Sequence, residues 1–288
     1  MRKWLVLAAA ATAALAMVAS GCGSDSAKTD SVKSTSGGSA PTADLGLKTD
    51  GKLLVGSDIP YAPFEFTKAG SSEPVGFDID LVKAIAATQG ITDIEFKKTG
   101  FDTIFIALKQ KRFDMVASSV TITPERAKVI DFGAPYFAAN QSIMVAKGKS
   151  ADLEALAGKN LTKAEALAAL TGLKLGVQRG TTGAELAKSV EGAEVSQYGI
   201  IDEAFNALAA GRVDAVVNDF PVSGYATKSK PQLAVVAQIT TDENLGLAFP
   251  KTNTALRDAM DAGLVKIKAD GTYAKIYEQW FGTKPPAE

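Results

Sequence analysis

Residues 101–119 read FDTIFIALKQKRFDMVASS, and residues 201–219 read IDEAFNALAAGRVDAVVND. The two segments align without a gap, and seven of the nineteen aligned positions are identical. Each segment has the pattern of an amphipathic helix, a tight turn and a buried strand. Apolar positions that any two such units share account for part of this identity. The repeat still favours two lobes built on one plan.

The sequence around the repeat has an α/β pattern. From Lys52 onward, short apolar strands alternate with helical stretches, which is typical of folds with mostly parallel sheets. Asp78 is the predicted N-cap of a helix that turns Leu81 and Ile85 inward. Strands are predicted at 52–56, 113–117, 173–177 and 213–217, and the last two helices at 254–268 and 272–280.

Two extended apolar runs, 140–146 and 244–249, lie between the patterns of the two lobes. The last two helices have no third core to join, so we expect them to pack back on the first lobe. The chain would then cross between the lobes twice, and a two-crossover hinge implies a cleft. Lobe 1 is predicted to comprise 51–142 and 247–282, lobe 2 to comprise 143–246 with the Ala-rich helical segment 150–171 as a surface addition, and 283–288 to form a tail.

The N-terminal segment 1–21 has the features of a secretory signal. Two basic residues precede an apolar run, and small residues lead directly into Cys22, the only cysteine of the chain. This arrangement resembles a bacterial lipoprotein signal, in which the cysteine is lipidated, although Ala19 stands where leucine is usual. The alternative is an ordinary secretory signal that contains a cysteine. Residues 22–50 are then the lipidated cysteine and a flexible, polar linker.

The composition excludes several classes of function. The chain has no histidine, so Ser-His-Asp and Cys-His mechanisms and His-ligated metal sites are excluded. We expect neither a metal nor a cofactor. With 31 basic and 32 acidic residues, the charge balance does not suggest a nucleic-acid partner. No stretch after the signal is long and apolar enough to cross a bilayer. We expect a monomer that is anchored to the membrane and does not span it.

Ligands of open α/β sheets collect beyond the carboxyl ends of the strands, and these places are polar here. After the strand at 113–117, Thr123 is a predicted N-cap with Pro124 at the first helical position, so Arg126 lies in the first turn. An arginine beside free backbone N–H groups can bind a carboxylate or a phosphate, although a lone arginine is more often an ordinary surface residue. The segment QRGTTG after the strand at 173–177 also offers hydroxyl and N–H donors to an anion.

The second copy of the repeat ends with an acid. By the repeat, Asp219 occupies the position of Ser119 in the other lobe, although a lone aspartate there is often only an N-cap. One lobe thus offers a cation and hydroxyls, and the other an anion and N–H donors. Such a cleft matches a zwitterion, with its carboxylate on Arg126 and its ammonium on Asp219. Asp58 and Gln178, equivalent positions in the two lobes, favour an amide or cationic side chain over a carboxylate.

Five short motifs together resemble one protein family. They are GSDIPYAPFEF at 56–66, GFDIDL at 76–81, SSVTITPER at 118–126, GVQRGTT at 176–182 and DGTY at 270–273. The combination resembles the polar amino-acid-binding proteins of ABC importers, solute-binding family 3, over residues 52–282. The resemblance implies the two-lobed type II fold of periplasmic binding proteins, with a two-crossover hinge.

The resemblance also implies a role for each motif residue. Arg126 would bind the α-carboxylate together with the backbone N–H groups of Thr121 and Thr182. The Ser119 carbonyl, the Thr121 hydroxyl and Asp219 would bind the α-ammonium. The side chain of the ligand would lie between Tyr61 and Phe101 with Asp58 at its polar end, although Phe101 could instead be a core residue. The expected ligand-binding residues are Asp58, Tyr61, Phe101, Ser118, Ser119, Thr121, Arg126, Gln178, Thr181, Thr182 and Asp219.

The function expected from these observations is capture of glutamine, arginine or lysine on the extracytoplasmic face of the membrane and delivery to the permease subunits of an ABC importer. Two alternatives remain open. The same domain can present a ligand to a receptor, and some proteins of this fold are dehydratases or lyases. Catalysis is disfavoured because no histidine is available as a general base and the candidate carboxylates are needed for charge pairing.

The lipid anchor can be tested by replacing Cys22. We expect the wild-type protein to partition into the detergent phase in a detergent phase separation. Cys22→Ala should release it to the aqueous phase or leave it as uncleaved precursor, because the lipidated atom is lost. Equal partitioning of mature wild type and variant would contradict the anchor.

Overall fold

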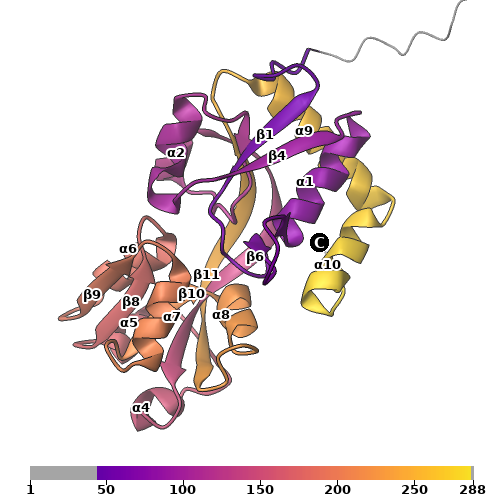
Figure 1. Cartoon of the computed structure of the whole chain (residues 1–288). Helices are drawn as coiled ribbons and strands as arrows, with labels where there is room; N and C mark the ends of the chain where they lie inside the picture. Colours follow the sequence, from indigo (N-terminus) through magenta and orange to yellow (C-terminus); the bar gives the residue numbers. More distant parts are fainter. Residues whose placement is uncertain (1–43, 287–288) are drawn as a thin grey trace, which may run out of the picture. The chain divides into compact units, whose positions relative to one another are not determined.

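The computed structural model describes residues 44–286, and Figure 1 shows how the helices and strands are arranged. The predicted signal at 1–21, the lipidation site Cys22 and most of the linker lie outside the described residues. The elements are β1 (Lys52–Ser57), β2 (Phe66–Thr67), β3 (Pro74–Val75), α1 (Phe77–Thr88), β4 (Asp93–Lys98), α2 (Phe101–Lys109), β5 (Met115–Val116), α3 (Pro124–Ala127), β6 (Asp131–Ala146), α4 (Ala151–Glu154), β7 (Lys159–Leu161), α5 (Lys163–Leu170), β8 (Lys174–Gln178), α6 (Thr182–Lys188), β9 (Glu194–Tyr198), α7 (Ile201–Ala209), β10 (Ala215–Asp219), α8 (Phe220–Ala226), β11 (Leu233–Phe249), α9 (Thr254–Ala269) and α10 (Thr272–Phe281).

Within the described residues, nine strands are connected by backbone pairing in the order β4-β1-β5-β11-β6-β10-β8-β9, with β7 added beside β11. At one end β4, β1 and β5 run parallel, and at the other end β9, β8 and β10 do so. The long strands β6 and β11 pair with each other in antiparallel fashion between these two groups. Figure 1 shows both strands running from one group of elements into the other. The two apolar runs expected to connect the lobes are parts of these strands.

The sequence repeat is a structural repeat. Segment α2–β5 lies beside β1, and segment α7–β10 lies beside β8, in the same parallel register. In the first copy the Asp114 N–H donates to the Leu54 carbonyl at 2.8 Å, and the Leu54 N–H donates to the Asp114 carboxylate at 2.8 Å. Asp214 and Lys174 make the same reciprocal pair at 2.7 and 2.8 Å. The aspartate at this place therefore fixes a parallel strand pair in each lobe, and the prediction of two lobes on one plan is confirmed.

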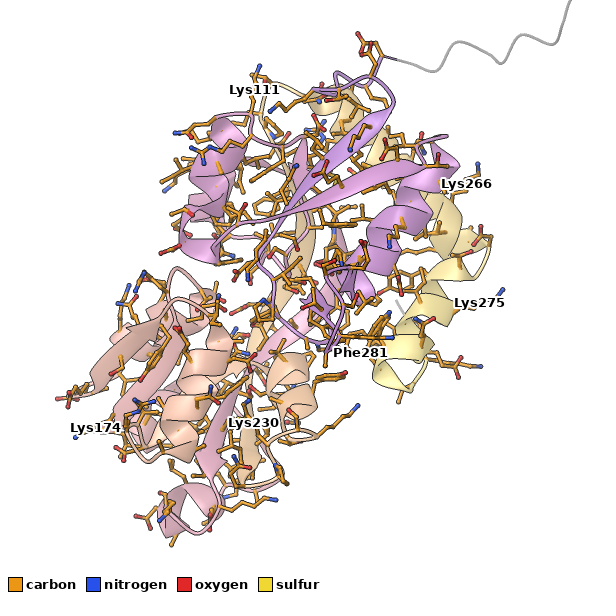
Figure 2. All side chains as sticks on the ribbon, in the orientation of Figure 1. Lys111, Lys174, Lys230, Lys266, Lys275 and Phe281 are labelled. Atoms are coloured by element: carbon orange, nitrogen blue, oxygen red, sulfur yellow. The ribbon has the colours of Figure 1, made fainter. Side chains whose placement is uncertain are left out.

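The C-terminal helices return to the first group of strands. Helices α9 and α10 both contact α1, as the prediction of a second crossover requires. An aromatic cluster joins α10 to α1 and to the sheet, because Phe77 of α1 lies edge-on to Tyr273 and the ring centroid of Phe137 on β6 lies 5.0 Å from that of Phe281. Figure 2 shows Phe281 at the end of α10, and Lys266 of α9 projecting outward. The exact residue boundaries of the lobes stay a prediction.

Three local predictions are wrong. The N-cap of α1 is Gly76 and not Asp78, whose buried side chain instead accepts a hydrogen bond from the Ser119 N–H at 2.8 Å. The predicted linker ends before residue 50, because Leu45 and Leu47 pack against the core. Segment 150–171 is more than a helical surface addition: its strand β7 joins the sheet, and three of its leucines, Leu153, Leu161 and Leu170, are buried.

Among the residues that the structure describes, none of the helices combines the length and the apolar character needed to cross a membrane.

Gly76 allows the segment 58–66 to lie against α1. Its φ is 141°, and a Cβ there would lie 2.0 Å from the Phe64 carbonyl oxygen. The N–H groups of Phe77 and Asp78 donate to the carbonyls of Pro63 and Phe64 across this contact. We predict that Gly76→Ala lowers the free energy of unfolding by more than about 3 kcal/mol, measured by urea denaturation.

Gly70→Ala is the matched control, because Gly70 has φ 79° and nothing within 4 Å of the added Cβ. It should cost only about 1–2 kcal/mol, the cost of the left-handed backbone alone. Equal losses for the two variants would show that the close approach to Phe64 does not matter.

Candidate ligand-binding site

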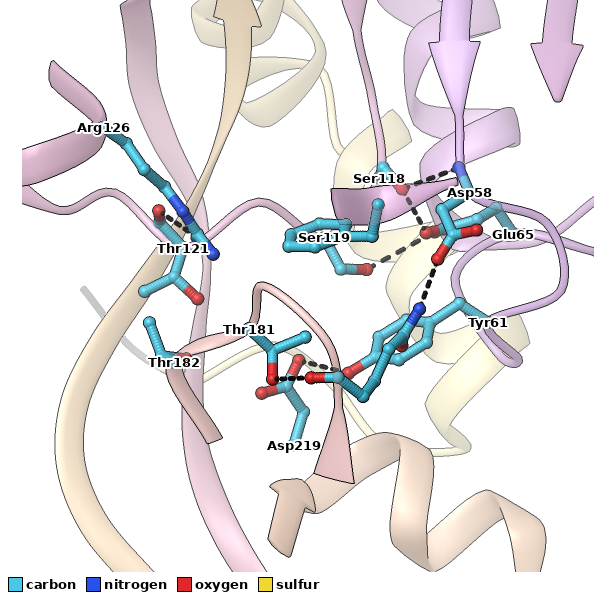
Figure 3. Close-up of a pocket in the computed structure, with 12 residues that line it drawn as sticks. Asp58, Tyr61, Glu65, Ser118, Ser119, Thr121, Arg126, Thr181, Thr182 and Asp219 are labelled. Carbon is cyan, nitrogen blue, oxygen red and sulfur yellow. Dashed lines mark hydrogen bonds between the residues drawn. The ribbon is translucent and has the colours of Figure 1, made fainter. Parts of the chain in front are cut away.

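One cavity brings together the polar strand ends of both lobes (Figure 3). About 300 Å³ of space, part of it open to solvent, lies between the side chains that line it. All eleven residues expected from the sequence line it, together with Glu65: Asp58, Tyr61, Glu65, Phe101, Ser118, Ser119, Thr121, Arg126, Gln178, Thr181, Thr182 and Asp219. Their roles toward a ligand stay predictions.

The repeat explains why these side chains face one another. Asp58 follows β1, and Gln178 ends β8, at equivalent places in the two lobes. The Gln178 Nε2 donates to Asp58 Oδ2 at 2.5 Å, which joins the lobes across the cavity. The next residue, Arg179, turns away from the cavity and pairs with Asp102 at 3.0 Å, as the alternation of side chains along a strand predicts.

Arg126 provides the positive charge of the cavity. As predicted, Thr123 caps the short helix α3, and its hydroxyl accepts from the Arg126 N–H. The guanidinium donates to the carbonyl of Thr121 at 2.8 Å and to that of Gly180 at 3.1 Å. It also lies 5.2 Å from the centre of the Phe101 ring. Burial lowers the pKa of Arg126, and none of the ion pairs in residues 44–286 involves it, so its charge can receive an anion.

Asp219 provides a negative charge in the second lobe. It is a buried residue whose carboxylate accepts from the Tyr61 hydroxyl at 2.8 Å and from the Gln141 Nε2 at 2.6 Å. Burial, and then the nearby charge of Glu243, raise the pKa of Asp219 to about 7. A carboxylate in this position is costly to ionise alone and would be stabilised by a cation.

Two more carboxylates line the cavity on the side of the first lobe. Burial raises the pKa of Asp58 to about 6 and that of Glu65 well above its ordinary value. The hydroxyl of Ser118 donates to Glu65 at 3.0 Å, while its oxygen accepts from the Asp58 N–H at 2.9 Å. Asp78, whose pKa burial raises to about 6, lies behind them and holds the backbone of Ser119 at φ 46°. This side of the cavity therefore favours a cation or a hydrogen-bond donor.

Sequence reasoning missed three polar residues here. Glu65 belongs to the motif at 56–66, but its side chain faces the cavity because of the antiparallel β-bridge between Tyr61 and Glu65, which the motif does not predict. Gln141 and Glu243 lie on β6 and β11 and contact the site from the hinge. Gln141 is a polar residue inside the otherwise apolar run 140–146, which could have drawn attention to it. The sequence alone does not show which groups the side chain of such a residue contacts. Among residues 44–286, no three histidine, cysteine or carboxylate side chains are arranged so that together they could hold a metal ion.

Comparison with known proteins gives consistent matches. A model of the family described as bacterial extracellular solute-binding proteins, family 3, matches residues 53–283. ABC transporter arginine-binding protein 1 of Escherichia coli (strain K12) is 35% identical over 244 residues, which cover 82% of this chain and 93% of that protein. The predicted family resemblance is confirmed.

Solved structures give the same result. An ancestral arginine-binding protein bound to arginine is 40% identical, with a TM-score of 0.71, and the match covers 81% of this chain and 99% of that one. The ancestral amino acid-binding protein AncCDT-1, described as a precursor of cyclohexadienyl dehydratase, is 38% identical with a TM-score of 0.69, over 80% of this chain and 95% of that one. The predicted two-lobed type II binding-protein fold is confirmed.

The raised pKa values predict how stability depends on pH without a ligand. Asp58, Asp78 and Asp219 have pKa values of about 6, 6 and 7 in the folded protein, against an ordinary value near 4. Between about pH 4 and 7 the folded state therefore binds more protons than the unfolded state, so stability falls as pH rises through this window. We expect the Tm to be lower at pH 8 than at pH 5 by on the order of 10 °C, measured by calorimetry.

Asp219→Asn is the control for this prediction, because the amide does not ionise. The variant should lose part of the decline in Tm, especially between pH 6 and 8. A Tm that rises over this interval in both proteins would contradict the assignment of the titration to the cavity.

Proposed function

We propose, from the premise that this chain belongs to the bacterial extracellular solute-binding proteins of family 3, that it binds a free polar or basic L-amino acid and delivers it to an ABC importer. The observation that carries this proposal is that one cavity is lined by Arg126 from lobe 1 and Asp219 from lobe 2.

The two charges suit the α-groups of an amino acid. Within residues 44–286, the Arg126 guanidinium donates hydrogen bonds only to neutral carbonyl oxygens, so a ligand carboxylate can add the charge-assisted pair that it lacks. Asp219 is buried and its pKa is raised to about 7, so a ligand ammonium would stabilise its ionised form. Each group gains a partner from one zwitterion, and enclosure between the lobes strengthens both pairs.

The remaining charges favour a basic side chain. Once the α-groups are paired with Arg126 and Asp219, two lining carboxylates are left, Asp58 and Glu65. A guanidinium or ammonium group would balance them, a glutamine amide could donate to them, and a second carboxylate would be repelled. We therefore place arginine and lysine before glutamine. The arginine-binding names of the relatives support this order.

Binding without catalysis fits the site best. The lining carboxylates are assigned to charge pairing, and the curated relative described above is named as a binding protein. The likeness to a precursor of a dehydratase makes an enzyme the second candidate. Turnover can be excluded if L-amino acids incubated with the protein remain chemically unchanged.

The remaining proposals concern location and partners. We propose a monomer held on the extracytoplasmic face of the cell membrane by lipid on Cys22. There it would deliver its ligand to the permease subunits of an importer. A receptor that recognised the loaded protein would use the same cleft, and uptake of labelled amino acid by cells with and without the protein distinguishes these roles.

A thermal-shift panel with L-arginine, L-lysine, L-glutamine and L-glutamate tests the function. A ligand at 100 times its Kd should add about 2.7 kcal/mol of stability. We expect L-arginine or L-lysine to bind at least about a hundredfold more tightly than L-glutamate, and Asp58→Asn to narrow the difference. Arg126→Ala and Asp219→Ala should each cost about 2–5 kcal/mol of binding free energy in calorimetry, because each leaves one ligand charge unpaired.

Arg179→Ala is the matched control for Arg126→Ala. It removes the same charge from a side chain that turns away from the cavity toward Asp102. Its affinity should stay within about threefold of wild type, since exposed pairs contribute little. Tight glutamate binding that Asp58→Asn leaves unchanged would overturn the proposed orientation of the ligand.

A further inference from the structure

Glu243 joins both lobes at the hinge without lining the cavity itself. Its Oε2 accepts three hydrogen bonds: from the Thr182 hydroxyl at 2.9 Å, from the Thr121 hydroxyl at 3.2 Å and from the Gln141 Nε2 at 3.2 Å. Thr121 follows β5 in lobe 1, Thr182 begins α6 in lobe 2, and Gln141 lies on the hinge strand β6. One carboxylate oxygen thus receives donors from both lobes and from the strand between them.

An irregularity in β11 places this side chain. Ile239 pairs with Gln141 and Glu243 with Ala139, so β11 has two residues more than β6 over this interval. The Asn140 side chain accepts from the N–H groups of Thr241 and Asp242 at 3.0 and 3.2 Å, and Asp242 has φ 51°. Hydrogen bonds from its own backbone thus stabilise this bulge, and Glu243 is the first residue after it that pairs with β6 again.

The hydrogen-bond directions matter for the cavity. A threonine hydroxyl has one proton, so donation to Glu243 leaves only lone pairs for any other partner. Thr121 and Thr182 both line the cavity, where those lone pairs would meet a ligand ammonium. Gln141 has a second N–H, which donates to Asp219 at 2.6 Å. Glu243 therefore orders two hydroxyls and, through Gln141, the carboxylate assigned to the ammonium.

Glu243 also acts on Asp219 through charge. The titratable groups that face Asp219 are Tyr61, Arg126 and Glu243. Glu243 is of like sign and raises the pKa of Asp219, whereas Arg126 and the Tyr61 hydroxyl lower it. Loss of the Glu243 charge should therefore leave Asp219 easier to ionise.

We propose that Glu243 is a positioning residue for the ammonium end of the ligand, because its carboxylate accepts hydrogen bonds from the hydroxyls of Thr121 and Thr182 and holds Gln141 against Asp219. This inference rests on the proposed function, since it concerns the same amino-acid site. It predicts two separate effects of removing the charge of Glu243. At high pH, ligand binding becomes weaker because the hydroxyls of Thr121 and Thr182 are no longer held as acceptors. At lower pH, ligand binding persists further because Asp219 ionises more easily.

The test compares Glu243→Gln with Asp242→Asn in the purified protein. Asp242 is exposed, is adjacent on the same strand and loses the same charge, while asparagine tolerates its backbone conformation. Affinity for the amino acid that wild type binds most tightly is measured by calorimetry from pH 5.5 to 8.5. At pH 8.5 we expect Glu243→Gln to bind about tenfold more weakly than wild type, the factor of one net hydrogen bond. As the pH is lowered below 7, both proteins should lose affinity because Asp219 becomes protonated. Glu243→Gln should lose it at a lower pH than wild type.

Asp242→Asn should match wild type in both measurements. Thr182→Val, at a half-buried residue, removes one of the ordered hydroxyls and should give a smaller loss at pH 8.5 without moving the low-pH decline. A Glu243→Gln profile equal to that of Asp242→Asn would overturn the inference. A uniform loss at every pH would also overturn it, because a simple strap between the lobes would act in that way. If wild type binds none of the amino acids, the proposed function itself fails.

Discussion

Strands β6 and β11 pair over most of their length, and this antiparallel contact holds both groups of parallel strands in one arrangement. Pairing of β11 with β5 on one side and of β6 with β10 on the other brings the carboxyl ends of the parallel strands to the same cavity. Every charge of the site is carried by a segment that enters or leaves these ends. A change in the β6–β11 register would therefore move Arg126 and Asp219 relative to each other before it affected either lobe core.

The cavity is assembled from groups that are poorly stabilised without a partner. Asp58, Glu65 and Asp219 are buried with raised pKa values, and hydroxyl, amide and backbone donors only partly offset this. The protein thus holds polar groups in place at a cost in stability and recovers part of that free energy when a ligand of opposite charge enters. Direct hydrogen bonds between the lobes, such as the one from Gln178 to Asp58, offset part of this cost.

Much of this arrangement could be predicted from the sequence, because the repeat makes equivalent residues of the two lobes face the same place. The repeat paired Asp58 with Gln178 and Ser119 with Asp219, and all four line the cavity. Asp78 was misassigned as a cap because its motif is also typical of helix starts, whereas the close approach at Gly76 depends on a distant segment. Glu65, Gln141 and Glu243 could not be placed, since their directions depend on a bridge and a bulge that no local pattern encodes.

The absence of histidine has a consequence for the solution chemistry of the protein. Most proteins of this size buffer near neutrality through their imidazoles, and this chain has none. Among the described residues, carboxylates with pKa values of about 6 to 7 lie in the cavity or directly behind it. Binding of a cation beside these carboxylates should therefore release protons near pH 6.5, and an acid–base titration can follow that release without any label.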